Sequence, residues 1–317
     1  MIVYLVVCLF AFFVVYLLIP VTKRWAVQFG VVDRPNARKI HQYPIPLSGG
    51  VAIYIGTILT LFLFFARTSL HYVLTWGGLM LILVGLIDDW YKSKGKDFPA
   101  WPKLIGQVAA AGLAYVMGIQ FFGIGHFWSG QGLLIFPEPL ALFMTIIWIV
   151  AFINMINFLD GVDGLASGIT TIASVTLFFI SIFKLQYDVA ALSVIMIGAS
   201  LAFLRHNFYP ASIFLGDAGS MFLGYMLGVI SLYGTMKSAT FIALLITILV
   251  LGVPIFDTAQ VIISRLVVGT PIYKADRRHV HHRLLRTGLT QRQTVVVIYA
   301  IGLIFSLLAL SILFFVE

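Results

Sequence analysis

Two adjacent carboxylates, Asp88 and Asp89, stand at the end of an apolar run in the segment GLIDDWYK. They repel each other, so a membrane surface that keeps both must supply a cation, a basic partner or a role in proton transfer. Successive helical residues point about 100° apart. We therefore expect one aspartate to face a site while the other orients a lysine. A helix end marked by solvated charges is the structural alternative.

The segment NMINFLDGVDGLASG holds the densest group of polar side chains. Asn154 and Asn157 are three residues apart, as are Asp160 and Asp163. If the segment is helical, this spacing places each pair on one face, and the glycines after the aspartates let a ligand approach the backbone. Such hard oxygen donors suit Mg²⁺, which shares phosphate oxygens. Helix capping explains one aspartate but not all four side chains.

Asp217 lies between two glycines in IFLGDAGSMFLG, where another apolar helix is expected to begin. The N–H groups and the dipole at a helix N-terminus favour anions, while an aspartate that only caps the helix is the alternative. Phe214, three residues earlier, is interpreted as a stacking platform for a nucleobase. An aromatic anchor at the membrane interface is the commoner explanation of such a residue.

Two basic segments indicate phosphate binding. The first, DRPNARKIHQYPIPLSGG, carries Lys39 and His41 in a loop that prolines and a glycine pair shape. The second, KADRRHVHHRLLRTG, mixes histidines with arginines that oppose a divalent cation and favour polyphosphate. We interpret it as an anion clamp, with loop charge that serves only topology as the alternative for both segments. The clamp residues are Arg277, His279, His281, His282 and Arg283.

Together these residues favour phosphoryl transfer. They offer carboxylates and amides for Mg²⁺, basic groups for phosphates and a base for an acceptor. The sequence has no Walker A motif, so ATP is not supported as the donor. A zinc hydrolase using HVHH is a second enzyme hypothesis, against which the missing H-E-x-x-H motif counts. A lipid-linked-sugar flippase or transporter is the alternative from another class, disfavoured because the apolar runs carry almost no ionisable groups near their centres.

Membrane helices must position these residues. Of 317 residues, 61% are hydrophobic and 10% charged, which excludes a soluble globular enzyme. The fold class is therefore all-α, a single polytopic integral membrane domain over residues 1–317, whose first apolar run is expected to be a retained span. The ten predicted transmembrane helices cover 2–20, 49–66, 70–87, 103–120, 139–157, 165–183, 189–204, 217–234, 239–256 and 294–315.

Lysine and arginine sort to one side of this topology. With the N-terminus outside, the loops 21–48, 88–102, 158–164, 205–216 and 257–293, with their flanking residues, hold 17 of the 20. Because such residues stay on the cytoplasmic side, we expect both termini outside and the active site on the cytoplasmic face. The net charge of +8 therefore requires no nucleic-acid partner. Outside, residues 121–138 are expected to form a short hairpin.

Five motifs, in order, resemble those of the polyprenyl-phosphate N-acetylhexosamine-1-phosphate transferases. They are DRPNARKIHQYPIPLSGG, GLIDDW, NMINFLDGVDGLASG, NFYPASIFLGDAGSMFLG and HVHHRLL, and they span nearly the whole chain. The histidines and the NFYPASIF run are more similar to the GlcNAc-1-phosphate transferases that initiate teichoic acid, O-antigen or related glycan synthesis than to the phospho-MurNAc-pentapeptide translocase.

The resemblance implies a multi-pass enzyme of the bacterial cytoplasmic (inner) membrane. It would transfer GlcNAc-1-phosphate from UDP-GlcNAc to undecaprenyl phosphate and release UMP, with another UDP-N-acetylhexosamine donor as the alternative. Asp217 would ligate Mg²⁺, or Mn²⁺ in its place, and Asp88 or Asp89 would be the acceptor's base. Asp89, Asp160 and Asp163 would serve as further metal or catalytic carboxylates, and the sequence leaves a homodimer open. The expected substrate-binding residues are Asn154, Asn157, Lys39, His41, Phe214 and the clamp residues.

Overall fold

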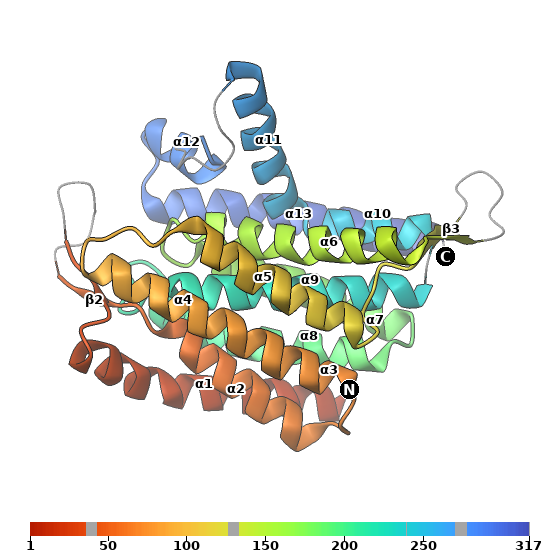
Figure 1. Cartoon of the computed structure of the whole chain (residues 1–317), viewed down its shortest axis with the longest axis horizontal. Helices are drawn as coiled ribbons and strands as arrows, with labels where there is room; N and C mark the ends of the chain where they lie inside the picture. The colour runs from red at the N-terminus through yellow and green to blue at the C-terminus, as the bar shows by residue number, and fades with distance from the viewer. Residues whose placement is uncertain (36–42, 126–132, 239, 270–277, 317) are drawn as a thin grey trace.

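The chain forms a bundle of long helices, seen in a computed structural model that describes residues 1–317 except 36–42, 126–132, 239, 270–277 and 317 (Figure 1). The helices are α1 (Ile2–Gln28), α2 (Gly49–Phe64), α3 (Ser69–Tyr72), the π-helical turn η1 (Val73–Gly77), α4 (Gly78–Ser93), α5 (Ala100–Val116), α6 (Glu138–Leu159), α7 (Leu165–Phe183), α8 (Tyr187–Asn207), α9 (Gly216–Ser238), α10 (Phe241–Val250), α11 (Gly252–Val268), α12 (Val280–Arg286) and α13 (Gln291–Val316). Two short antiparallel pairs join some of them: β1 (Val32–Asp33) with β2 (Ile45–Pro46), and β3 (Gly123–Gly125) with β4 (Leu133–Ile135).

The helices confirm a multi-pass membrane protein. Among the described residues, seven helical segments are long and apolar enough to cross a membrane, and α10 with α11 makes an eighth if the bent pair is one span. α2 and α5, with 16 and 17 residues, are shorter. The ten predicted spans fall on helical segments, of which the third covers α3, η1 and α4 and the ninth covers α10 and α11. Ten complete crossings stay a prediction.

The predicted ninth span, 239–256, is not one continuous helix, because it is divided between α10 and α11. The chain bends by 83° between α10 and α11, and residues 257–268, expected in a loop, continue α11 to Val268. Pro254 lies in the first turn of α11, where a missing N–H costs no helical hydrogen bond. The predicted hairpin within 121–138 is confirmed, since Gly123 pairs with Ile135 and Gly125 with Leu133.

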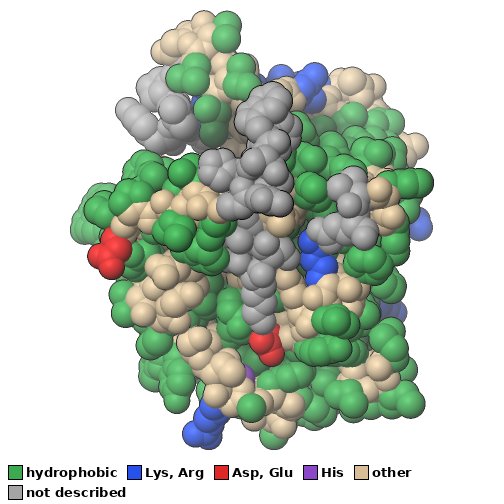
Figure 2. Space-filling view, turned by 90° about the vertical axis from the view of Figure 1, so that its right-hand side faces the viewer, with side chains coloured by type: hydrophobic (Ala, Val, Ile, Leu, Met, Phe, Trp, Pro, Cys, Tyr) green, Lys and Arg blue, Asp and Glu red, His purple; other side chains and the backbone are tan. Residues whose placement is uncertain are grey.

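The polar motifs gather at one end of the bundle. α4 and α6 finish there and α9 begins there, and we call it the site end (Figure 1). The start of α1 and the end of α13 lie at the opposite end. Figure 2 views that opposite end, and the side chains that it colours include only scattered charged groups. The charge asymmetry of the sequence therefore corresponds to two chemically different ends of the fold.

α9 runs through the core, packed by α2, α4 and α6, and its residues from Ala218 to Leu232 are buried. Two glycines let its neighbours approach its first turn. A Cβ on Gly50 of α2 would collide with the backbone of Gly219, and one on Gly85 of α4 with the backbone of Ala218. Small residues at helix crossings allow such close packing in membranes. Three helices thus meet beside Asp217.

Gly50→Ala is therefore expected to destabilise the fold by about 1–3 kcal/mol or more, since the added methyl meets backbone that cannot rotate away. Gly112→Ala on α5 is the matched control, because within the described residues its added Cβ would meet no atom of another helix within 4 Å. It should be neutral or stabilising by about 0.5–1 kcal/mol. Thermal unfolding of both variants in one detergent measures the difference, and an unchanged melting temperature for Gly50→Ala would contradict the close crossing.

The π-helical turn η1 lies between α3 and α4 and is held by two tyrosines. Tyr54 of α2 donates its hydroxyl to the Thr75 carbonyl at 2.9 Å, and Tyr225 of α9 donates to the Val73 carbonyl at 3.1 Å. These bonds come from two of the helices that pack against α4, and they favour the wide turn. Such turns are frequent near functional sites, and α4 leads from this one to Asp88 and Asp89.

Candidate active site

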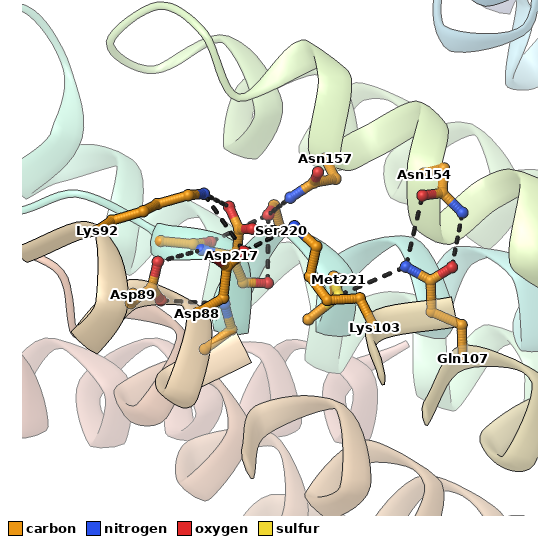
Figure 3. A network of polar contacts seen from close by, with 12 residues as sticks. Asp88, Asp89, Lys92, Lys103, Gln107, Asn154, Asn157, Asp217, Ser220 and Met221 are labelled. Carbon is orange, nitrogen blue, oxygen red and sulfur yellow. Dashed lines mark hydrogen bonds and ion pairs between the residues drawn. The ribbon is translucent and has the colours of Figure 1, made fainter. Parts of the chain in front are cut away.

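Three aspartates and two lysines meet where α4 ends and α9 begins (Figure 3). Lys103 of α5 donates to Asp88 Oδ2 at 2.6 Å and to Asp217 Oδ2 at 2.8 Å. Lys92 donates to Asp217 Oδ1 at 2.6 Å and lies 3.5 Å from Asp88 Oδ2. Asp88, Asp89 and Asp217 are all buried. Figure 3 shows the lysines reaching Asp217 from opposite sides, so both of its carboxylate oxygens carry an ammonium partner.

The adjacent aspartates of α4 have different partners. Asp89 Oδ1 accepts the backbone N–H of Asp217 at 2.9 Å, and Oδ2 accepts that of Ala218 at 3.2 Å. It thus caps the N-terminus of α9 from a neighbouring helix, where free N–H groups and the helix dipole favour a carboxylate. Asp88 instead faces the lysines. Of the two predicted bases, the geometry favours Asp88.

The asparagines of α6 tie three helices together. Asn157 Nδ2 donates to Ser220 Oγ in the first turns of α9, at 2.7 Å. Asn154 exchanges hydrogen bonds with Gln107 of α5: its Nδ2 donates at 2.8 Å, and the Gln107 amide donates back at 3.4 Å. Gln107 lies one turn beyond Lys103, so this amide pair anchors the part of α5 that presents the lysine.

Asp160 and Asp163 separate from each other. A shared face required a helix through both, and this condition is not met, because α6 ends at Leu159 and both lie in the turn that follows, within the predicted loop 158–164. Asp160 stays beside the cluster: burial, followed by the nearby charges of Asp217 and Asp89, raises its pKa well above the usual range. Asp163 Oδ2 instead accepts the backbone N–H of Ala211 at 3.0 Å, between α8 and α9.

The histidine segment, which we define as His279 to His282, packs against this turn. A Cβ on Gly161, the residue after Asp160, would lie 2.6 Å from His281 Nε2. The His281 ring centroid lies 5.9 Å from that of His279 and 4.3 Å from that of His282. Burial lowers the pKa of His281 to about 4, so this imidazole is neutral at neutral pH. It can therefore hydrogen-bond a phosphate but cannot supply the positive charge of an anion clamp.

Asp257 of α11 contacts the histidine segment through both of its carboxylate oxygens. Its Oδ2 lies 2.8 Å from His279 Nδ1, and its Oδ1 accepts the backbone N–H of Val280 at 2.7 Å. Both Asp257 and His279 are buried. Asp257 therefore lies on the helix that follows the bend, and it orients His279. The histidine segment in turn lies beside the turn that carries Asp160.

Other predicted site residues are placed less completely. Lys39, His41 and Arg277 lie outside the described residues. Arg283 is exposed on α12. Phe214 joins the β1–β2 pair to α9, because its N–H donates to the Pro46 carbonyl at 2.9 Å and its carbonyl accepts the Gly49 N–H at 3.1 Å. Contact of any of these with a substrate stays a prediction.

Comparison with known proteins decides the family. Residues 70–235, which run from α3 into α9 and include Asp88, Asp160 and Asp217, match the model described as glycosyl transferase family 4. The chain belongs to glycosyl transferase family 4.

Three relatives show how far the similarity extends beyond that range. A protein of Bacillus subtilis strain 168 named probable undecaprenyl-phosphate N-acetylglucosaminyl 1-phosphate transferase is 38% identical over 93% of this chain and 81% of its own length. The decaprenyl-phosphate N-acetylglucosaminephosphotransferase of Mycolicibacterium smegmatis is 34% identical over 86% of this chain and 73% of its own. The undecaprenyl-phosphate alpha-N-acetylglucosaminyl 1-phosphate transferase of Escherichia coli K12 is 29% identical over 87% and 75%.

Several side chains of this family 4 site were not predicted from the sequence. Lys92 follows Asp88 by four residues, so helical spacing could have identified it as the lysine expected beside the aspartate pair. Lys103 and Gln107 gave no such signal, because they lie 114 and 47 residues from Asp217 and Asn154. The remaining two, Ser220 and Asp257, were not predicted either.

The family 4 site has an oxygen-donor set suited to a divalent cation. Among the described residues, the ammonium groups of Lys92 and Lys103 are the two that lie near Asp88, Asp89, Asp160 and Asp217. In the described part of the chain, no group of three or more His, Cys, Asp or Glu is arranged to hold a metal ion. The two lysines occupy the oxygens of Asp217 instead. Because carboxylate oxygens are the donors that Mg²⁺ prefers, the residues fit that ion chemically.

Proposed function

We propose that this family 4 glycosyl transferase transfers GlcNAc-1-phosphate from UDP-GlcNAc to a polyprenyl phosphate and releases UMP. The observation that carries the proposal is the cluster of Asp88, Asp217, Lys92 and Lys103 at one end of a membrane helix bundle. Its relatives are named for that transfer, with undecaprenyl or decaprenyl phosphate in the name. We propose undecaprenyl phosphate as the acceptor, because the Bacillus relative is the most similar of those described.

In the proposed reaction an oxygen of the lipid phosphate attacks the β-phosphorus of UDP-GlcNAc. A new P–O bond forms as the bond between that phosphorus and the UMP oxygen breaks, so one diphosphate replaces another. Asp88 keeps the acceptor phosphate deprotonated by taking its proton. Lys92 and Lys103 would neutralise phosphate oxygens beside the buried carboxylates that they pair with. The histidine segment and Arg283 are proposed to contact the donor.

We also propose that Asp217 and Asp160 hold Mg²⁺, with Mn²⁺ as a substitute. A bound divalent cation would supply charge neutralisation of the donor diphosphate. Asp89 and Asp163, the other two predicted ligands, already accept backbone N–H groups, so the proposal is confined to the other pair. We expect chelation by EDTA to stop UMP release and added Mg²⁺ to restore it.

The proposed topology has ten crossings in a single domain over 1–317, with both termini outside and the site on the cytoplasmic face of the bacterial inner membrane. The sorting of lysine and arginine supports it. So does the position of the carboxylate cluster at the end of the bundle away from the start of α1 (Figure 1).

UMP release tests the proposed function. Purified protein with undecaprenyl phosphate and Mg²⁺ should release UMP from UDP-GlcNAc at least about tenfold faster than from UDP-GalNAc or UDP-MurNAc-pentapeptide. Without lipid, no UMP should appear. A stoichiometric UMP burst under that condition would instead show a covalent aspartyl-phosphate path. Movement of a lipid-linked sugar across vesicles with no UMP release would support the flippase alternative and overturn the proposal.

Asp257→Asn should raise the KM for UDP-GlcNAc by about 10- to 100-fold with a smaller change in kcat, because it removes the carboxylate that orients His279. Ser264→Ala is the matched control on the same helix. It removes the 2.9 Å hydroxyl bond from Arg278 but leaves the backbone carbonyl that Arg278 also contacts. Initial rates over a range of UDP-GlcNAc measure both variants, and an unchanged KM in Asp257→Asn would remove its positioning role.

A further inference from the structure

An apolar cavity of about 420 Å³ lies on the side of α4 that faces away from the aspartates. α1 and α4 form its two sides, and the β1–β2 region and the start of α2 form its floor. From α4 it is lined by Leu83, Leu86, Ile87 and Trp90, which are spaced as one stripe of a helix. The other lining residues are Thr22, Trp25, Ala26, Phe29, Val31, Leu47, Ser48 and Val51.

The body of α4 separates this cavity from the reaction site. Gly85, Asp88, Asp89 and Lys92 form the opposite stripe, packed on α9 or paired with Asp217. A helix with its side chains is about 10 Å across. An acceptor lipid with its phosphate at Lys92 would have to pass round the end of α4 before its chain entered the cavity. The cavity therefore suits a second lipid better than the proposed acceptor.

The mouth of the cavity has the character of a membrane interface. Trp25, Phe29 and Trp90 line it and remain 58%, 63% and 41% exposed, and aromatic residues of this kind gather where the hydrocarbon meets the headgroups. Lys94 comes four residues after Trp90, and its Nζ lies 3.7 Å from the Trp90 ring centroid. A cation fixed on an aromatic rim above an apolar cavity is complementary to a lipid with a fatty chain and an anionic headgroup.

We propose that this cavity binds one acyl chain of an anionic phospholipid, with the lipid phosphate against Lys94. The lipid would belong to the leaflet at the site end and would fill the space between α1 and α4. It would brace the helix that carries Asp88 and Lys92 from the face opposite the reaction. This site is additional to the acceptor and donor sites of the proposed function.

Lipid retention by the purified full chain tests the proposal. The protein is incubated with equimolar phosphatidylglycerol, phosphatidylethanolamine and undecaprenyl phosphate, and bound lipid is counted by native mass spectrometry. Ile87→Trp fills the cavity from a side chain that is 47% exposed, and Leu303→Trp adds the same bulk at a 52% exposed position on α13. We expect wild type and Leu303→Trp to retain one phosphatidylglycerol, and Ile87→Trp to retain at least about fivefold less. Lys94→Gln should lose the preference for phosphatidylglycerol over phosphatidylethanolamine.

Two outcomes overturn the proposal: equal phosphatidylglycerol retention by Ile87→Trp and Leu303→Trp, or selective loss of undecaprenyl phosphate from Ile87→Trp. The second would assign the cavity to the acceptor. If Ile87→Trp fails to fold, fluorescence quenching by phosphatidylglycerol with brominated chains replaces it. Quenching should be strong in wild type and weak in the Trp25→Phe, Trp90→Phe double variant, and equal quenching would overturn the proposal. No nucleotide sugar is present, so the result is independent of whether the chain is a transferase.

Discussion

Asp217→Asn is expected to reduce UMP release from UDP-GlcNAc by at least about 10³-fold while the protein still folds. Asp217 is the carboxylate on which the site converges, with Lys103 on one oxygen and Lys92 on the other. The amide has nearly the same shape but no charge, so it can neither hold the two ammonium groups as firmly nor serve as the proposed ligand of Mg²⁺. Because the cations that Asp217 holds act on the reacting phosphates, the loss should appear mainly in kcat.

Asp188→Asn provides the control for this substitution. Asp188 lies in the first turn of α8, outside the site, where it accepts the Tyr233 hydroxyl at 3.4 Å. The same chemical change there should leave UMP release within about twofold of wild type. Thermal unfolding in detergent separates lost activity from lost fold. Near-normal turnover by well-folded Asp217→Asn would remove both the metal role and the central place of this residue.

The adjacent aspartates of α4 should respond differently to the same substitution, which gives the second large effect. Asp88→Asn is expected to slow UMP release by about 10²- to 10⁴-fold, the usual contribution of a general base. Asp89→Asn removes the charge from the cap of α9 and offers one good acceptor to two N–H groups. It should destabilise the fold by about 1–3 kcal/mol and retain more activity than Asp88→Asn.

The two variants differ by one position, so each serves as the other's control. Rates and melting temperatures are measured on the same preparations, with temperature kept well below both transitions. If Asp89→Asn were the less active of the two and as stable as wild type, the roles would be exchanged. Asp89 would then be the base, and capping would not be its main contribution.

Local spacing in the sequence was sufficient for much of this fold. Apolar run length located every long helix, because crossing hydrocarbon requires about 20 apolar residues whatever the neighbours are. The glycine and aromatic pattern near 121–138 correctly indicated the β3–β4 hairpin. The segments that contain Asp88, Asp160 and Asp217 were also found in the sequence, since charged groups are costly in apolar surroundings and stand out there.

Residue-level pairing was beyond the same reasoning. Nothing near Lys103 or Gln107 in the chain indicates partners on α9 and α6, because helix packing alone brings them together. Spacing alone could not decide whether Asp160 and Asp163 share a helix face, and α6 stops one residue before the first of them. The bend at Leu251 was missed for a related reason: hydropathy is continuous through it, so only geometry shows that α11 leaves the direction of α10.

The π-helical turn η1 sets the rotational phase of everything that follows it in α4. A π turn accommodates one more residue than an α turn, and each residue advances a helix by about 100°. If Val73–Gly77 became a regular α-turn with no residue removed, each later side chain would occupy its successor's place. Val84 would meet the backbone of Ala218 where Gly85 now fits, and Asp88 would replace Asp89 beneath the N-terminus of α9. The chemistry of α4 therefore depends on a single residue inserted about three turns away.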